Sequence, residues 1–246
     1  MESQSQKARS MKPYQKIPIQ ECHEPLVPIP LEQFAVESPH PYLKLGADYA
    51  GKSPYYLRQG VLDALLAAQN NLQQNRQGWR ILIFDAYRPI AVQQFMVDYT
   101  FQSLVRERKL NLAELSTQQK EQLWQEVYQF WAIPSDNPAT PPPHSTGAAI
   151  DVTLVDAEGK IVEMGSPIDE ISERSHPLHY ANATTPTEQI YHQNRQILNT
   201  AMTSGAFCCH PREWWHFSLG DQIWALQYNR EHPNNPITAR YGGWVQ

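Results

Sequence analysis

A histidine and an aspartate, His144 and Asp151, stand at the two ends of the segment HSTGAAID. Alternating side chains predict a strand over residues 148–154, which places Asp151 inside it. An unpaired carboxylate in a buried strand is unfavourable, because its charge is removed from water. A metal ion shared with His144 would supply the missing positive charge. The alternative is a histidine in a turn and an aspartate in a salt bridge.

A second group of ionisable residues occupies the segment HPREWWH, residues 210–216. Glu213 and His216 would share one face of a helix but point to opposite faces of a strand. Residues 214–219 are predicted to form a strand, so a bend or bulge must separate Glu213 from His216 if both serve one site. Two tryptophans between polar residues are equally typical of a packed core.

The two segments together contain the donors of a catalytic metal site. Two histidines and one carboxylate are a common ligand set for catalytic zinc, with the fourth position left to water. A separate carboxylate must then accept a proton from that water and pass it on, and Glu213 is the candidate. Arg88, in a YRP turn after a predicted buried strand, is placed to stabilise a developing negative charge. A structural ion pair between Arg88 and Asp85 is the alternative.

Helices are predicted on both sides of the strand that precedes Arg88. This strand is the short apolar run WRILIF, residues 79–84. The helix before it has apolar residues at spacings of four and three, namely Val61, Leu65, Ala68 and Leu72. Pro89 suits the first turn of the helix after it. The inner face of that second helix contains Val92, Phe95, Met96 and Tyr99.

Two further helices are predicted from their first residues. Ser116 and Gln119 fit a capping box, and this helix is expected to pack antiparallel to the preceding one. Its apolar residues are Leu123, Val127, Phe130 and Trp131. The segment TPTE, residues 185–188, is a second start signal, for a helix that ends near Gly205. Its apolar residues are Ile190, Ile197 and Leu198. The predicted class is α+β, a small and mostly antiparallel sheet flanked by helices.

Proline marks the irregular parts of the chain. There are 20 prolines in 246 residues, whereas average usage would give about 12. Seven lie within the first 41 residues. Residues 1–41 are therefore predicted to be an extended arm, frayed at its start, that packs on a domain of residues 42–246. A second proline-rich stretch, residues 133–143, leads into His144.

Three motifs in a fixed order give the chain a specific resemblance. They are DAYRP at residues 85–89, HxxGxAxD at residues 144–151 and EWWH at residues 213–216. Together they resemble the D-alanyl-D-alanine dipeptidase family (VanX type), within the superfamily of hedgehog-related zinc D,D-peptidases. Weaker similarity extends from about Tyr42 to the C-terminus. The resemblance implies a zinc dipeptidase domain over residues 42–246, with one Zn²⁺ ion per chain, that hydrolyses D-Ala-D-Ala or a similar small dipeptide.

The resemblance also implies roles for individual residues. His144, Asp151 and His216 would bind zinc. Glu213 would be the catalytic base, and Arg88 would stabilise the tetrahedral intermediate.

The two ends of the dipeptide would be held by further residues. Asp169, in the segment MGSPID, matches a family carboxylate that binds the substrate ammonium, and Tyr42 or Tyr49 would lie near that ammonium. Pro142 stands where the family usually has a serine that contacts substrate, and proline has neither a hydroxyl nor an N–H donor. Ser145, or the threonine after it, would then replace that serine.

Other residues that could bind a metal have simpler explanations. A proline separates His176 from His179, which makes them a poor helical chelate, so a structural or substrate-lining role is expected. The adjacent Cys208 and Cys209 are interpreted as packing residues, and His210 as a loop residue behind the ligands. Core or lid positions are expected for Trp124, Phe130 and Trp131.

Two other functions remain open. A D,D-carboxypeptidase or endopeptidase acting on peptidoglycan would be an exported protein, whereas the first 12 residues are polar and have no apolar signal region. A non-catalytic zinc-binding domain is the second alternative, but a purely structural site needs no carboxylate in the place of Glu213.

Composition sets further limits. The net charge of −5 does not favour a nucleic-acid surface. No apolar run reaches the length of about 18 residues that a membrane span needs. Three cysteines, two of them adjacent, do not form a disulfide framework, which favours the cytoplasm. A processed, exported chain would be periplasmic instead. The expected partner is a small dipeptide, and the sequence defines no oligomeric state.

Overall fold

A five-stranded sheet in the order β2–β4–β5–β7–β6 forms the centre of the computed structural model, which describes residues 11–243. The predicted fraying concerns residues 1–10 and lies outside this range. Strands β4, β5, β7 and β6 pair antiparallel, and the short β2 pairs in parallel with β4. The α+β class with a mostly antiparallel sheet is therefore confirmed. The strands are β2 (Ala35–Val36), β4 (Arg80–Asp85), β5 (Ala149–Val155), β6 (Cys208–Cys209) and β7 (His216–Ser218).

The two longest strands, β4 and β5, lie at the middle of the sheet. All seven residues of β5 are buried, because helices and loops cover both of its faces. The register of β4 against β5 shifts between Ile83 and Asp85, so that Asp85 lies opposite Asp151. The end of the sheet therefore brings two carboxylates together, and cations must balance them.

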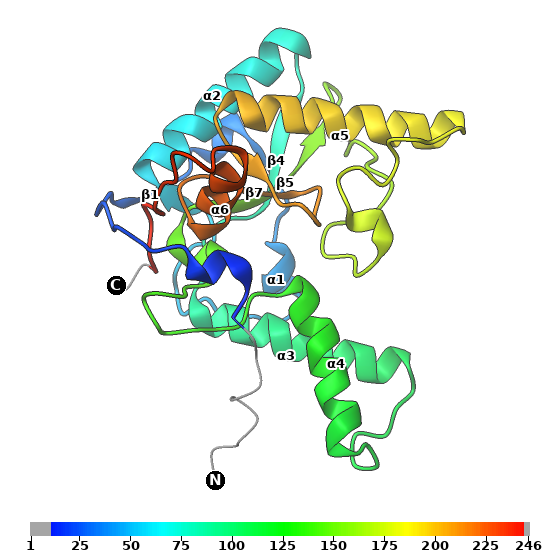
Figure 1. The fold of residues 1–246 in the computed structure, drawn as a ribbon. Coiled ribbons are helices and arrows are strands. Elements are labelled where there is room, and N and C mark those ends of the chain that lie inside the picture. Colours follow the sequence, from blue (N-terminus) through cyan, green and yellow to red (C-terminus); the bar gives the residue numbers. More distant parts are fainter. Residues whose placement is uncertain (1–10, 244–246) are drawn as a thin grey trace.

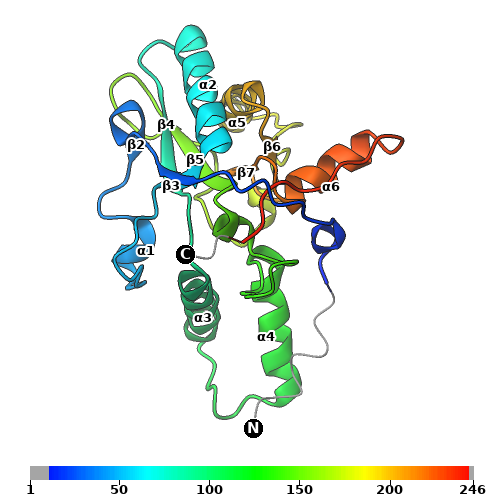
Figure 2. The same ribbon diagram turned by 90° about the vertical axis from the view of Figure 1, so that its left-hand side faces the viewer.

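Helices α2 (Gln59–Asn75) and α5 (Pro186–Ser204) lie side by side against the sheet (Figures 1 and 2). The predicted apolar face of α2 is buried in the main core, as is Leu198 of α5. Ile190 differs from the prediction, since 52% of it is exposed. Its turn lies near the start of α5, in the part of the helix that extends past the sheet in Figure 1.

Helices α3 (Ile90–Glu107) and α4 (Thr117–Phe130) form the predicted pair, below the sheet in Figure 1. Pro89 is the residue before α3, one position earlier than expected. The capping box at the start of α4 is confirmed, with Gln119 N donating to Ser116 Oγ over 3.2 Å. These helices have a second apolar core, into which α1 (Pro41–Lys44) contributes Tyr42.

The proline-rich arm contributes edge strands and a short turn. Strand β1 (Leu26–Pro28) pairs with β3 (Tyr56–Arg58), and β2 extends the main sheet. Between the turn of residues 13–16 and β1, the arm runs along the C-terminal segment, where Gln20 N donates to Ala239 O over 2.8 Å. Helix α6 (Gln222–Glu231) lies beside that turn. No helix in residues 11–243 is long and apolar enough to span a membrane.

Candidate metal centre

Three elements bring His144, Asp151 and His216 to one point. His144 lies in a short 3-10 turn (Pro143–Thr146) that leads into β5, where Asp151 is the third residue. His216 is the first residue of β7, and the strand register places it opposite Asp151. All three side chains are buried.

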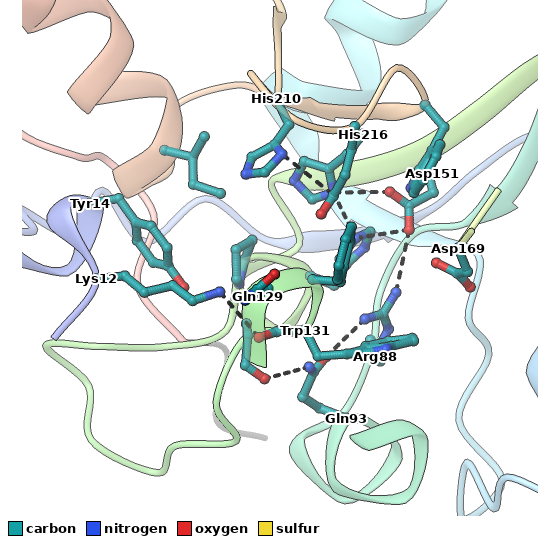
Figure 3. Close-up of a pocket in the computed structure, with 17 residues that line it drawn as sticks. Lys12, Tyr14, Arg88, Gln93, Gln129, Trp131, Asp151, Asp169, His210 and His216 are labelled. Atoms are coloured by element: carbon teal, nitrogen blue, oxygen red, sulfur yellow. Dashed lines mark hydrogen bonds and ion pairs between the residues drawn. The ribbon is translucent and has the colours of Figure 1, made fainter. Parts of the chain in front are cut away.

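The donor atoms of these residues face one another, and Figure 3 labels Asp151 and His216 among them. His144 Nε2 lies 3.2 Å from Asp151 Oδ2 and 3.2 Å from His216 Nδ1. His216 Nδ1 lies 2.9 Å from Asp151 Oδ1. One donor atom from each residue lies within 4.8 Å of the others, a spacing that suits ligation of a single metal ion.

The outer nitrogens of both imidazoles have their own acceptors. His144 Nδ1 lies 2.8 Å from Ala86 O, to which it donates. Ser218 Oγ donates to Asp221 Oδ2 over 2.8 Å and lies 3.4 Å from His216 Nε2, so it can accept the proton of that nitrogen. Both rings then turn a lone pair toward the carboxylate of Asp151. With the rings in these tautomers three acceptors converge, and a divalent metal ion fits between them.

Gly147 lets the turn of His144 enter β5. Its φ is +71°, and a Cβ atom there would lie 2.3 Å from Leu26 Cδ1 of the arm. A side chain would therefore be strained and would also collide with β1. This explains a glycine between the first two metal-binding candidates.

Glu213 lies beside the donor cluster, in the turn before β7. Because β7 begins only at His216, the predicted bend between the two residues is present. Burial raises the pKa of Glu213 to about 7, partly opposed by His216. A carboxyl group with such a pKa can exchange protons near neutral pH. Trp214 and Trp215 are both buried, so they are also core residues.

Arg88 lies at the end of β4 that faces the cluster. Its Nε donates to Asp85 Oδ2 over 2.9 Å, so the structural ion pair considered from the sequence is present. The same guanidinium lies 3.4 Å from Asp151 Oδ2, and its other end is held by Gln93. Burial alone would raise the pKa of Asp85, but Arg88 and His40 hold it well below its usual range.

Asp169 and Tyr42 lie together at one end of the site. Tyr42 Oη donates to Asp169 Oδ2 over 2.9 Å and accepts from Arg88 over 3.0 Å. Burial and the charge of Asp151 raise the pKa of Asp169 to about 7, partly opposed by Arg88. Tyr49 has a different partner, since its Oη donates to Asp85 Oδ1 over 3.3 Å.

The hydroxyl groups expected to replace the missing serine do not reach the site. Ser145 Oγ donates to Arg88 O over 2.8 Å, and Thr146 Oγ1 donates to Pro143 O over 2.6 Å. Neither residue lines the cavity that holds the donor cluster. Their side chains instead fix the turn that presents His144.

The remaining candidates from the sequence lie outside the donor cluster. His176 lies 3.7 Å from Glu173 near the surface. Burial raises the pKa of Cys209 to about 12, so it remains a thiol. His210 lines the cavity, with Nδ1 3.6 Å from Glu213 Oε2.

The donor cluster opens into a small cavity of about 60 Å³. Two distant segments contribute walls of this cavity, and of the four residues concerned the sequence had indicated only Phe130, as a core or lid position. The arm contributes Lys12 and Tyr14, and the end of α4 contributes Gln129 and Phe130. No local motif marks these residues, because only the packing of the arm against α4 and α6 brings them to the donors.

A buried His/Asp/His donor set with a separate carboxylate beside it is the arrangement of single-metal hydrolases. Comparison with known protein families identifies which kind of hydrolase this is. The model of the D-Ala-D-Ala dipeptidase family matches residues 36–238, and the chain belongs to this family of metallopeptidases. The resemblance carried by the three sequence motifs is thus confirmed.

Individual relatives agree with the family assignment. A D-alanyl-D-alanine dipeptidase from Synechocystis sp. is 52% identical over 238 residues, which cover 94% of this chain and 96% of the relative. The D-alanyl-D-alanine dipeptidase from Enterococcus faecium is 32% identical over 153 residues, 62% of this chain and 68% of that protein. Among solved structures, the LdcB LD-carboxypeptidase aligns with a TM-score of 0.42 and 14% identity, over 88% of this chain and 78% of that chain.

Proposed function

We propose that this protein is a zinc-dependent dipeptidase that hydrolyses D-Ala-D-Ala or a similar small dipeptide. The observation that carries the proposal is the convergence of His144, Asp151 and His216 beside the buried carboxyl group of Glu213. The relatives named as D-alanyl-D-alanine dipeptidases support the substrate. We also propose that the catalytic domain begins near residue 42 and that the arm before it packs on this domain as part of the same folded unit.

In this proposal the three donors hold Zn²⁺. A zinc ion held by these residues would act as a Lewis acid and would lower the pKa of a water molecule to about 7. Glu213 accepts the proton of the attacking water and then donates it to the leaving amine. Burial of this carboxyl group favours its protonated form, which the second transfer needs.

The positively charged edge of Arg88 and the carboxylate of Asp169 would orient the substrate. Arg88 is held rigidly by Asp85 and Gln93, so little reorganisation is needed when it stabilises the negative charge of the tetrahedral intermediate. Asp169 has no cationic side chain within 4.0 Å among residues 11–243. A substrate ammonium would supply that charge, and Tyr42 would position the carboxylate.

The small cavity favours a free dipeptide over the peptidoglycan chain that a carboxypeptidase would bind. The carboxyl group of Glu213 favours catalysis over a purely structural metal site. We also propose the cytoplasm as its compartment, because Cys22, Cys208 and Cys209 form no disulfide.

The test is a hydrolysis screen of the zinc-loaded protein against L,L-, L,D- and D,D-dipeptides and a muropeptide that ends in D-Ala-D-Ala. We expect turnover of the D,D-dipeptide. Glu213→Ala should keep one zinc per chain and lose about 10²- to 10⁴-fold in kcat. Glu173→Ala, an exposed glutamate outside the cavity, is the control. Near-wild-type turnover in Glu213→Ala would show that the base is another group.

A further inference from the structure

The cavity beside the donor cluster has opposite charges at its two ends. Asp169 lies at one end, and Lys12 of the arm lies at the other, with the donor residues between them (Figure 3). A free dipeptide has complementary charges: an ammonium at one end, a carboxylate at the other and the scissile bond in the middle.

Lys12 is a partly buried ammonium without an anionic partner among the described residues. Its Nζ donates to Trp131 O over 3.1 Å, and no carboxylate lies within 4.0 Å of it among residues 11–243. An ammonium has three N–H donors, so two are left for a ligand. Burial lowers the pKa of Lys12, although the nearby Glu213 opposes this shift. A bound anion would offset the cost of burying the charge.

Tyr14 and Gln129 also line this cavity, but the hydrogen-bond donors that they offer are neutral. Pro143, Phe130 and Ile223 line the same cavity with apolar side chains, and proline has no N–H group. The other cationic side chain of the cavity, Arg88, is paired with Asp85 and lies at the Asp151 end. Lys12 is therefore the cationic group best placed to bind an anion at the end of the cavity opposite Asp169.

The fold holds the backbone of Lys12 in place. Lys12 N donates to Gln15 Oε1 over 2.8 Å, and the neighbouring Tyr14 is buried. Farther along the arm, Gln222 Nε2 of α6 donates to Ile17 O over 2.7 Å. The lysine thus projects from an anchored turn rather than from a free tail.

We propose that Lys12 binds the C-terminal carboxylate of the substrate and so makes the protein selective for peptides with a free C-terminus. The inference rests on the proposed dipeptidase function. It gives the arm a direct part in substrate selection, since the arm supplies one end of the binding site and the catalytic domain supplies the other.

The test compares D-Ala-D-Ala with its C-terminal amide. A hydrogen-bonded charge pair predicts that the wild type prefers the free acid by about 10- to 100-fold in kcat/KM. Lys12→Met should lose most of this preference, and Lys12→Arg should keep part of it. Lys16→Met is the matched control, because Lys16 is an exposed lysine in the same turn. Partial unfolding would lower both activities together and leave their ratio unchanged. A Lys12→Met protein that keeps the wild-type ratio overturns the proposal.

A binding measurement separates this inference from the proposed function. Calorimetry with zinc-loaded Glu213→Ala measures the affinity for D-Ala-D-Ala without turnover. Adding Lys12→Met should weaken binding of the acid about 10- to 100-fold and leave binding of the amide unchanged. If Glu213→Ala binds the acid equally tightly with and without Lys12→Met, the role of Lys12 is refuted, even if the wild-type protein is an active dipeptidase. If Lys12→Met weakens binding of the acid as expected but the wild-type protein hydrolyses no dipeptide, only the proposed function is refuted.

Discussion

Replacing Ser218 by alanine tests how the fold prepares His216 for metal binding. Ser218 Oγ lies between Asp221 Oδ2, at 2.8 Å, and His216 Nε2, at 3.4 Å. By accepting the Nε2 proton, the hydroxyl would hold the imidazole with its Nδ1 lone pair toward Asp151. Without it, His216 can rotate or carry its proton on Nδ1, and either change must be reversed before the metal binds. We therefore expect Ser218→Ala to weaken metal affinity.

The size of the effect follows from the hydrogen bonds that are lost. Groups that orient a metal-binding histidine typically contribute about 10- to 100-fold in affinity. This range corresponds to about 1.4 to 2.8 kcal/mol. Asp221 Oδ2 also loses a buried donor, whereas Asp221 Oδ1 keeps its bond from Trp224 N at the start of α6. Destabilisation of the metal-free protein by about 1–3 kcal/mol is expected as well.

Competition with a chromophoric chelator measures the zinc affinity, and urea unfolding of the metal-free protein measures stability. Ser175→Ala is the control, because Ser175 is an equally buried serine whose hydroxyl donates to Glu170 O, away from the donors. It should lose stability but keep zinc affinity. If Ser218→Ala binds zinc as tightly as the wild type, the hydroxyl does not orient His216, and the argument from hydrogen bonding is wrong.

Three further predictions concern other parts of the site. Asp169→Asn should raise KM for D-Ala-D-Ala by about 10- to 100-fold with unchanged zinc content, and steady-state kinetics with metal analysis checks this. Gly147→Ala should destabilise the protein by about 2 kcal/mol or more in urea unfolding, and adding Leu26→Ala should remove the steric part of that loss but not the backbone strain. Folding lowers the pKa of Asp85, because Arg88 outweighs the effect of burial. Its stabilising effect is therefore complete above about pH 5 and is lost as the pH falls, so the destabilisation by Asp85→Asn should shrink from about pH 5 to about pH 2 in the metal-free protein.

Local sequence patterns predicted most of the secondary structure near the site. The capping box at Ser116 and the cap at Thr185 start α4 and α5, because capping depends only on neighbouring residues. Predictions failed where burial depends on distant segments. Ile190 is exposed because the first turns of α5 extend past the sheet, although its spacing suits a buried face. The last strand is shorter than predicted, since Trp214 and Trp215 pack into the core from a turn.

The sequence by itself determined the identities and order of the candidate metal donors, the proposed catalytic carboxylate of Glu213 and the family. These features depend on residue type and spacing, which can be read directly from the linear sequence. Only the tertiary structure decided that Tyr42 bonds to Asp169, 127 positions away, and that Lys12 enters the same cavity. Such contacts arise when the arm and the helices pack around the sheet, and no local pattern encodes which surfaces meet.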